Sequence, residues 1–135
     1  VFSQDTDMMA AIGAAHDQQP VDCVMVDEAQ FLSDGQVWQL SRVADDLRIP
    51  VMCYGLRTDF HGNLFPRSAR LLAIADVIRE IRTICHCGSK ATMVVRQDEQ
   101  GAVIREGAQI EIGGNERYIS LCRRHWCEAM DDGTG

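Results

Sequence analysis

The stretch Val24-Met25-Val26-Asp27-Glu28-Ala29-Gln30-Phe31 decides the fold of this 135-residue chain. A short apolar run ends abruptly in two carboxylates, which are followed by an amide and an aromatic ring. A short run rich in valine, isoleucine and leucine is typical of a buried strand in a parallel sheet. Acidic side chains just past its end would stand at the carboxyl edge of that sheet, where open α/β folds bind their ligands.

Two interpretations of the Asp27-Glu28 pair are open at this point. In P-loop NTPases, a strand that ends in Asp supplies the carboxylate that holds Mg²⁺ against the phosphates. The Glu that follows is then well placed to act as a general base. The alternative is a helix N-terminus with acidic residues in its first turn. The pair by itself favours neither interpretation.

The flanking segments predict an α/β arrangement. Residues 5–18 place apolar side chains on one helical face, and Asp5 or Thr6 is expected to cap that helix. Ser33 and Gln36 match a capping box, and an apolar helical stripe follows them. A strand on each side of this second helix predicts a right-handed parallel βαβ unit. The strands are expected at 21–26, 51–56 and 77–84, and a further short helix at 69–75.

Composition and charge narrow the classes of partner. Hydrophobic residues make up 46% of the chain and charged residues 24%, the balance of a soluble globular protein. No apolar run approaches the roughly 20 residues of a membrane span. The net charge of −7 argues against a nucleic-acid groove, which needs a concentrated basic face. The chain begins at Val1 rather than at a methionine, so we expect a piece of a longer protein.

Two pairs of metal-binding side chains stand far apart in the sequence. Cys85-His86-Cys87-Gly88 is answered by Cys122-Arg123-Arg124-His125. Three thiolates and one imidazole complete a tetrahedral zinc site with no open position, so the predicted site is structural. The predicted ligands are Cys85, Cys87, Cys122 and His125. His86 and Cys127 are spare candidates that could replace one of them, and reduced cysteines without metal are the alternative.

The character of the sequence changes at Cys85, from alternating helices and strands to a glycine-rich, β-leaning pattern. A domain boundary is therefore expected near residue 84. A second domain of about 50 residues has too small a core to fold alone, and bound metal would supply the missing free energy. The expected domains are 1–84 and 85–130, with a disordered tail at 131–135.

Five motifs occur in an order and at spacings that resemble a known family. They are Val26 to Phe31, Tyr54 to Phe60, the Cys85/Cys87 pair, the Cys122/His125 pair, and Ile112 to Tyr118. Together they resemble the zinc-containing, cellular (type II) thymidine kinases, the bacterial branch in particular. The resemblance implies a P-loop NTPase (RecA-like) parallel sheet, truncated at its N-terminus, and a small C-terminal zinc-ribbon or β-ribbon domain with a lasso loop.

The resemblance also implies an activity and a set of site residues. The family transfers the γ-phosphate of ATP to the 5′-hydroxyl of thymidine, in pyrimidine salvage. Glu28 would be the general base, and Asp27 would help to hold the Mg²⁺ that accompanies ATP. The nucleoside-binding residues would be Phe31, Leu56, Phe60, Phe65, Gln109, Ile110, Glu111, Ile112, Gly113 and Tyr118. The resemblance further implies a cytoplasmic homotetramer inhibited by thymidine triphosphate.

One departure from the family pattern is serious. The family opens with a glycine-rich phosphate loop, and no G-x-x-x-x-G-K-[ST] motif occurs anywhere in this sequence. Without that backbone cradle and its lysine, the phosphates of ATP have no site. We therefore expect these residues alone to be inactive, and the first strand, the phosphate loop, the next helix and the next strand to be missing.

Two other functions compete with the kinase. Asp27-Glu28-Ala29-Gln30 is also the DEAQ box of helicase-type ATPases. A helicase needs a second motor domain and a basic surface that binds the strand, and this short acidic chain offers neither. The second competitor is a non-catalytic zinc-ribbon interaction module on a degenerate NTPase-like domain, which the absent phosphate loop favours.

Overall fold

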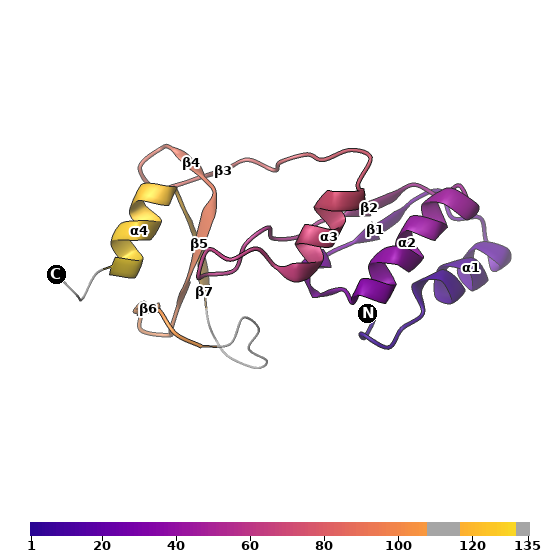
Figure 1. The fold of residues 1–135 in the computed structure, drawn as a ribbon, viewed down its shortest axis with the longest axis horizontal. Coiled ribbons are helices and arrows are strands. Elements are labelled where there is room, and N and C mark those ends of the chain that lie inside the picture. Colours follow the sequence, from indigo (N-terminus) through magenta and orange to yellow (C-terminus); the bar gives the residue numbers. More distant parts are fainter. Residues whose placement is uncertain (108–116, 132–135) are drawn as a thin grey trace. The chain divides into compact units, whose positions relative to one another are not determined.

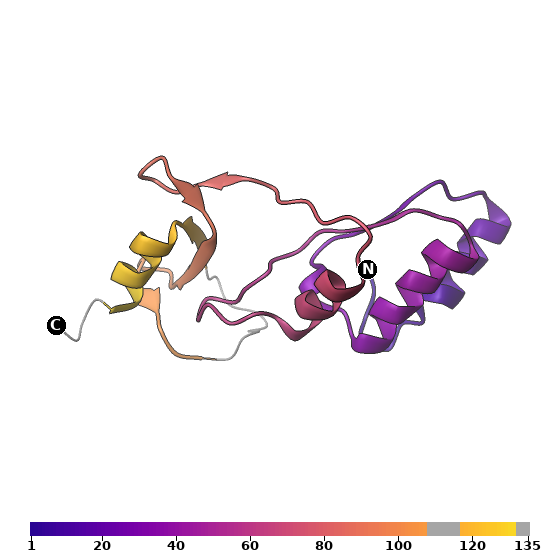
Figure 2. The same cartoon turned by 45° about the horizontal axis from the view of Figure 1, so that its top comes forward.

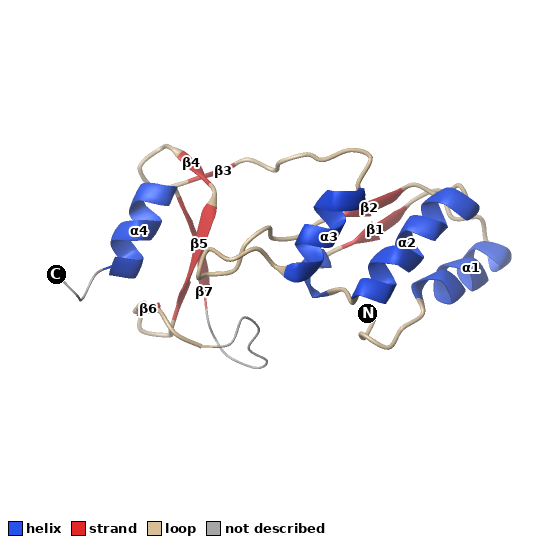
Figure 3. Cartoon of the chain, viewed as in Figure 1, coloured by secondary structure: helices blue, strands red, loops and turns tan. Residues whose placement is uncertain are grey.

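A computed structural model describes residues 1–107 and 117–131, which form an α/β structure with small sheets (Figure 1). Figure 3 distinguishes its helices from its strands. In chain order the elements are α1 (Met8–Gln18), β1 (Val24–Val26), the 3₁₀ helix η1 (Ala29–Phe31), α2 (Asp34–Asp46), β2 (Val51–Cys53), α3 (Pro66–Ile74), β3 (Thr83–Ile84), β4 (Lys90–Ala91), β5 (Met93–Gln97), β6 (Val103–Ile104), β7 (Arg117–Leu121) and α4 (Arg123–Asp131).

The chain divides into two compact units. The first consists of Val1–Arg57 and Phe65–Asp76, and the second of Thr58–Leu64 and Val77–Gly135. This division differs from a boundary near residue 84 in two ways. The segment from Val77 onward already packs with the second unit, and the short loop Thr58–Leu64 joins that unit as well.

The first unit contains the predicted βαβ arrangement. Strands β1 and β2 are parallel, with Val24 opposite Val51 and Val26 opposite Cys53, and α2 connects them. Both strands are shorter than the sequence predicts. The residues of the core are Met8, Val26, Ala29, Leu32, Val37 and Leu40, with side chains of β2 and α3 packed against them.

One face of this two-stranded sheet carries the core and the other does not. Side chains alternate between the faces of a strand, so Met25 and Met52 point away from the core. They are 70% and 42% exposed. Figure 2 shows α1 and α2 side by side, in agreement with their mutual packing.

The helix starts of the first unit follow local rules of the sequence. Ser33 Oγ accepts from the backbone N–H of Gln36, and the Gln36 side chain accepts from the N–H of Ser33, so the predicted capping box is present. Helix α1 is capped by Asp7, whose Oδ1 accepts from the N–H of Ala10. The predicted caps Asp5 and Thr6 were therefore wrong by one or two positions.

The second unit is built on antiparallel strands. Its main sheet has the order β6-β5-β7, and β3 and β4 form a separate hairpin. The third strand predicted at 77–84 is much shorter in the structure, because only Thr83–Ile84 forms a strand, and it pairs antiparallel with β4. Helix α4 was not predicted, although Trp126, Ala129 and Met130 pack on the core at helical spacing.

Within the described residues, no helix has both the length and the apolar character needed to cross a membrane.

Candidate functional site

The two carboxylates lie directly after β1, where the sequence predicts them. Asp27 and Glu28 are both exposed, and the N–H of Glu28 donates to Asp27 Oδ1 over 2.9 Å. Glu28 has a left-handed backbone conformation, with φ of 53°, which a residue other than glycine adopts infrequently. Helix η1 begins at the next residue without a side-chain cap from Glu28, so this turn directs the carboxylate away from a capping role.

The buried amide of Gln30 connects this turn to the second strand. Its Nε2 donates to Glu28 Oε2 over 2.5 Å, and its Oε1 accepts from the N–H of Leu56 over 3.2 Å. A Cβ at Gly55 would lie 2.6 Å from Gln30 Oε1, so a glycine is required for this close approach. One side chain thus fixes the orientation of Glu28 and the distance between the ends of β1 and β2.

Three of the predicted apolar residues belong to the first unit. The rings of Phe31 and Phe65 meet edge to face, with centroids 6.0 Å apart. Phe65 is only 4% exposed, whereas Leu56 is 44% exposed, and the backbone oxygen of Leu56 accepts from Ser68 Oγ. Phe65 therefore serves mainly as core beneath Phe31, and Leu56 is the residue of the three with most free surface.

The other two apolar candidates that the structure describes belong to the second unit. Phe60 is 2% exposed, and its ring lies 4.2 Å from the guanidinium carbon of Arg96. Tyr118 is 52% exposed and stands directly opposite Arg96 in the β5–β7 pairing. Residues directly opposite each other in an antiparallel pair share a face of the sheet, so Tyr118, Arg96 and the overlying Phe60 lie together.

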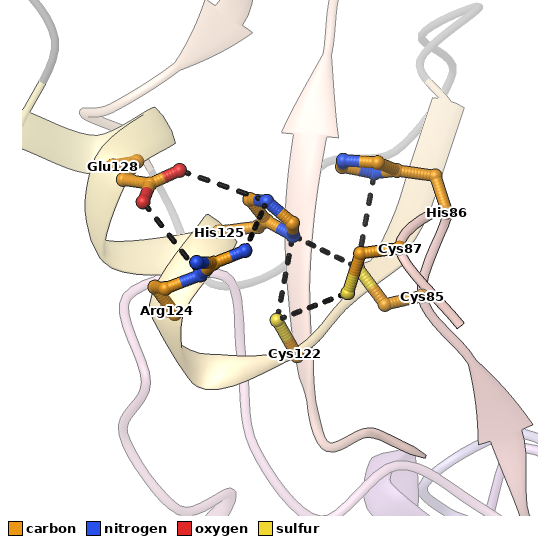
Figure 4. Close-up of polar contacts among 7 residues, drawn as sticks. All are labelled: Cys85, His86, Cys87, Cys122, Arg124, His125 and Glu128. Carbon is orange, nitrogen blue, oxygen red and sulfur yellow. Dashed lines mark hydrogen bonds and ion pairs between the residues drawn. The ribbon is translucent and has the colours of Figure 1, made fainter. Parts of the chain in front are cut away.

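The four predicted metal ligands meet at one point of the second unit. Cys85 and Cys87 come from the β3–β4 turn, in which Gly88 has φ of +86° and donates its N–H to the oxygen of Cys85. Cys122 directly follows β7, and His125 lies in the first turn of α4. The ligand atoms all lie within 4.8 Å of one another (Figure 4).

The spacing of these atoms fits a zinc ion. His125 Nδ1 lies 3.3 Å from Cys85 Sγ and 3.4 Å from Cys122 Sγ, and the sulfurs of Cys87 and Cys122 are 3.9 Å apart. Zinc bonds of about 2.3 Å to sulfur and about 2.05 Å to nitrogen, at tetrahedral angles, put ligand atoms about 3.5 to 3.8 Å apart. The cluster is therefore compatible with a closed, four-ligand zinc site.

The surroundings of the cluster also suit a metal. Hydrogen bonds from the side chain and then the backbone of Ser89 lower the pKa of Cys87 to about 6, which favours the thiolate that binds metal. His125 turns Nδ1 to the sulfurs, while its Nε2 lies 3.8 Å from Glu128 Oε2, the position of an outer carboxylate (Figure 4). The spare candidate His86 stacks on the His125 ring instead of joining the four ligands. The other spare, Cys127, is exposed and outside the cluster.

Comparison with known proteins supplies the deciding observation. A sequence model of the family described as thymidine kinase matches residues 2–126, which include both the carboxylate turn and the metal cluster. The chain belongs to the thymidine kinase family.

Individual thymidine kinases agree closely with it. The thymidine kinase of Agrobacterium fabrum is 64% identical over 130 residues, which are 96% of this chain and 67% of that protein. That of Idiomarina loihiensis is 64% identical over 129 residues, with the same coverage. That of Rhizobium meliloti is 70% identical over 111 residues, 82% of this chain and 57% of that protein. The chain thus spans about two thirds of the length of the first two relatives. The match to the thymidine kinase family also overturns the helicase alternative.

The structure describes some of the site residues that the sequence predicted, whereas others lie outside the described residues. Gln109, Ile110, Glu111, Ile112 and Gly113, the predicted lasso residues, lie outside the described residues. Sequence reasoning missed Gln30 and Arg96. A glutamine placed between two acids and an aromatic residue could have indicated the first. No local pattern distinguishes Arg96 from a surface arginine on a strand.

Proposed function

We propose that the protein containing this chain transfers the γ-phosphoryl group of ATP to the 5′-hydroxyl of thymidine. The observation that carries the proposal is the carboxylate pair at the end of β1, braced by Gln30, inside a family match that spans residues 2–126. The relatives at 64% and 70% identity are named thymidine kinases, which supports the same substrate here.

Glu28 is the proposed general base. Phosphoryl transfer depends mainly on positioning and on stabilising charge, so the protein has to supply a carboxylate within reach of the attacking hydroxyl. The hydrogen bond from Gln30 restricts one oxygen of Glu28, and the carboxylate as a whole remains exposed to a substrate. Gln30 is accordingly a positioning residue in this proposal.

Asp27 is the proposed contact to Mg²⁺, directly or through water. The donor set fits this role in part, since carboxylate oxygens are the ligands that Mg²⁺ prefers and Asp27 is exposed at the end of a parallel strand. The bound ion would neutralise charge on the phosphates. Asp27 Oδ1 also accepts from the N–H of Glu28, which keeps the two carboxylates in a fixed relation.

The residues proposed to contact the nucleoside are the apolar side chains predicted from the family resemblance and the segment 109–113. Phe31 and Leu56 supply surface in the first unit, with Phe65 supporting Phe31 from the core. Phe60 and Tyr118 supply it in the second. Backbone groups of Gln109 to Gly113 would bind the polar edge of the base, a role that places little demand on side-chain identity.

The zinc is proposed to be structural. Four protein ligands leave no open position for a substrate, so the ion would hold α4 and the β3–β4 turn together and would not take part in phosphoryl transfer. A thymidine triphosphate inhibitor, a homotetramer and a cytoplasmic location stay predictions from the family resemblance.

The sequence also sets a limit on activity. These 135 residues contain no G-x-x-x-x-G-K-[ST] motif, so we expect the isolated chain to show no ATP-dependent turnover of thymidine. The absent motif is the specific observation that favours the second candidate, a non-catalytic zinc-containing interaction module. Turnover by the protein that contains the chain would decide for the kinase.

The decisive variant in that protein is Glu28→Gln, which keeps the shape of the side chain and removes its basicity. We expect kcat to fall about 10²- to 10⁴-fold, the usual contribution of general acid–base catalysis. Asp22→Asn is the matched control, because Asp22 is an exposed carboxylate shortly before the same strand. A Glu28→Gln enzyme with a kcat within threefold of the parent would refute the assigned role.

A further inference from the structure

A fully buried arginine occupies the central strand of the second unit. Arg96 is 1% exposed in β5, between the flanking strands β6 and β7. An ionised guanidinium loses its hydration on burial, so its neighbours have to replace the lost interactions. The Phe60 ring is one such neighbour, since its centroid lies 4.2 Å from the guanidinium carbon, the geometry of a cation–π contact.

The position of Arg96 in the sheet relates it to the connection between β6 and β7. Arg96 pairs with Ile104 on one side and with Tyr118 on the other. The connection that leaves β6 and enters β7 therefore starts and ends beside this one residue. Near its start, Gly107 has φ of +135°, and a Cβ there would lie 2.5 Å from Arg96 Nη2. The guanidinium thus packs against the backbone at Gly107.

The loop that carries Phe60 has its own internal order. Asp59 Oδ1 accepts from the N–H groups of His61 and Asn63, and an isolated antiparallel β-bridge pairs Thr58 with Leu64. Trp126 Nε1 donates to the oxygen of Phe60 over 3.2 Å. Trp126 therefore fixes the backbone of the loop, whereas Arg96 is in contact with the ring itself.

We propose that Arg96 is a positioning residue for the nucleoside. It holds the Phe60 ring and the backbone at Gly107 in a fixed relation, on the face of the sheet that presents Tyr118. The proposal rests on the proposed function, because Phe60 and Tyr118 are groups assigned to the nucleoside. At 1% exposure Arg96 acts through these neighbours.

The test compares Arg96→Met and Arg96→Lys in the protein that contains the chain. Methionine approximates the length of the arginine stem without its charge, and lysine keeps the charge without the planar group. For both variants we expect the KM for thymidine to rise at least tenfold, with kcat and the KM for ATP within threefold of the parent. Hydrogen exchange should become faster in 58–64 and 101–107, while the zinc content stays unchanged.

Arg105→Met is the matched control. Arg105 belongs to the same unit and is exposed, and its side chain donates to the backbone oxygens of Ala129 and Met130, while only its backbone oxygen, which the substitution keeps, contacts His61 of the Phe60 loop. It should leave the KM for thymidine within twofold of the parent. If the Arg96→Met protein does not fold, Arg96→Lys decides the question.

A KM for thymidine within twofold of the parent in the folded Arg96 variants, with unchanged exchange of 58–64, would overturn the proposal. An equal rise in both KM values would do so too, since it indicates a general structural role. A parent protein that does not phosphorylate thymidine would instead refute the proposed function, so the two failures are distinguishable.

Discussion

The two compact units of this chain have cores of different kinds. The main buried cluster of the first unit consists of six apolar residues drawn from α1, β1, η1 and α2 and their connections. The buried cluster of the second unit has five, and two of these, Cys85 and Cys122, belong to the four-residue cluster that is compatible with zinc. The difference teaches that burial of apolar surface can order the first unit, whereas we expect the second to need a bound metal, because small cores supply little stability.

Removing the metal should give the largest effect and affect only the second unit. Structural zinc contributes about 10–16 kcal/mol of apparent binding free energy, as much as the entire stability of an ordinary domain. We expect a chelator, or Cys122→Ser, to abolish the slow hydrogen exchange of β5 and β7 while α2 keeps its protection. Hydrogen-exchange mass spectrometry of the whole chain measures both regions at once.

Cys127→Ser is the control for this experiment, because Cys127 is exposed and outside the ligand cluster. It should retain one zinc per chain. Slow exchange of β5 and β7 after complete loss of metal would remove the contrast between the units.

Truncating a core side chain of the first unit should give the next largest effect. It should destabilise the first unit and leave the second unchanged, the reverse of metal removal. Leu40 is 3% exposed in α2, so Leu40→Ala is expected to lower the free energy of unfolding of this unit by about 2–5 kcal/mol. Zinc content should not change. Urea unfolding followed by circular dichroism measures the stability, and Leu72→Ala, at a 40% exposed position of α3, is the control with an expected change below about 0.5 kcal/mol.

Removing the N-terminal cap of α2 should give the smallest effect, and this effect should again be confined to the first unit. Ser33→Ala deletes the acceptor for the N–H of Gln36 and should cost about 0.5–2 kcal/mol in the first unit. Ser41→Ala removes a hydroxyl from the exposed face of the same helix, where Ser41 Oγ donates to the oxygen of Trp38, and should change stability much less. Equal effects of the two substitutions in thermal unfolding would contradict the capping role.

The part of the fold that the sequence predicted well depends on local chemistry. The capping box at Ser33 and Gln36 involves residues three positions apart, and the parallel β1–β2 pair follows from two apolar runs joined by one helix. The sequence also predicted that Cys85, Cys87, Cys122 and His125 come together, because Cys-x-Cys and Cys-x-x-His are specific patterns even when they are far apart.

The rest could not be predicted because it depends on contacts between distant segments. The apolar residues of 77–84 fit a third parallel strand equally well, and only the pairing of Ile84 with Lys90 settles their antiparallel partner. The burial of Arg96 requires Phe60, which is 36 positions away in a loop of polar residues. Helix α4 was missed because the whole sequence after Cys85 was interpreted as β-leaning.

The separation of the two ligand pairs has a consequence for biosynthesis. Cys87 and Cys122 are 35 positions apart. At about 5–20 residues per second, a ribosome delivers Cys122 roughly 2–7 s after Cys87. All residues of the first unit have been translated before Cys85, so this unit can fold on the nascent chain while the first two thiols have no partners. A zinc ion held by all four residues would therefore bind only after Cys122 and His125 have been made.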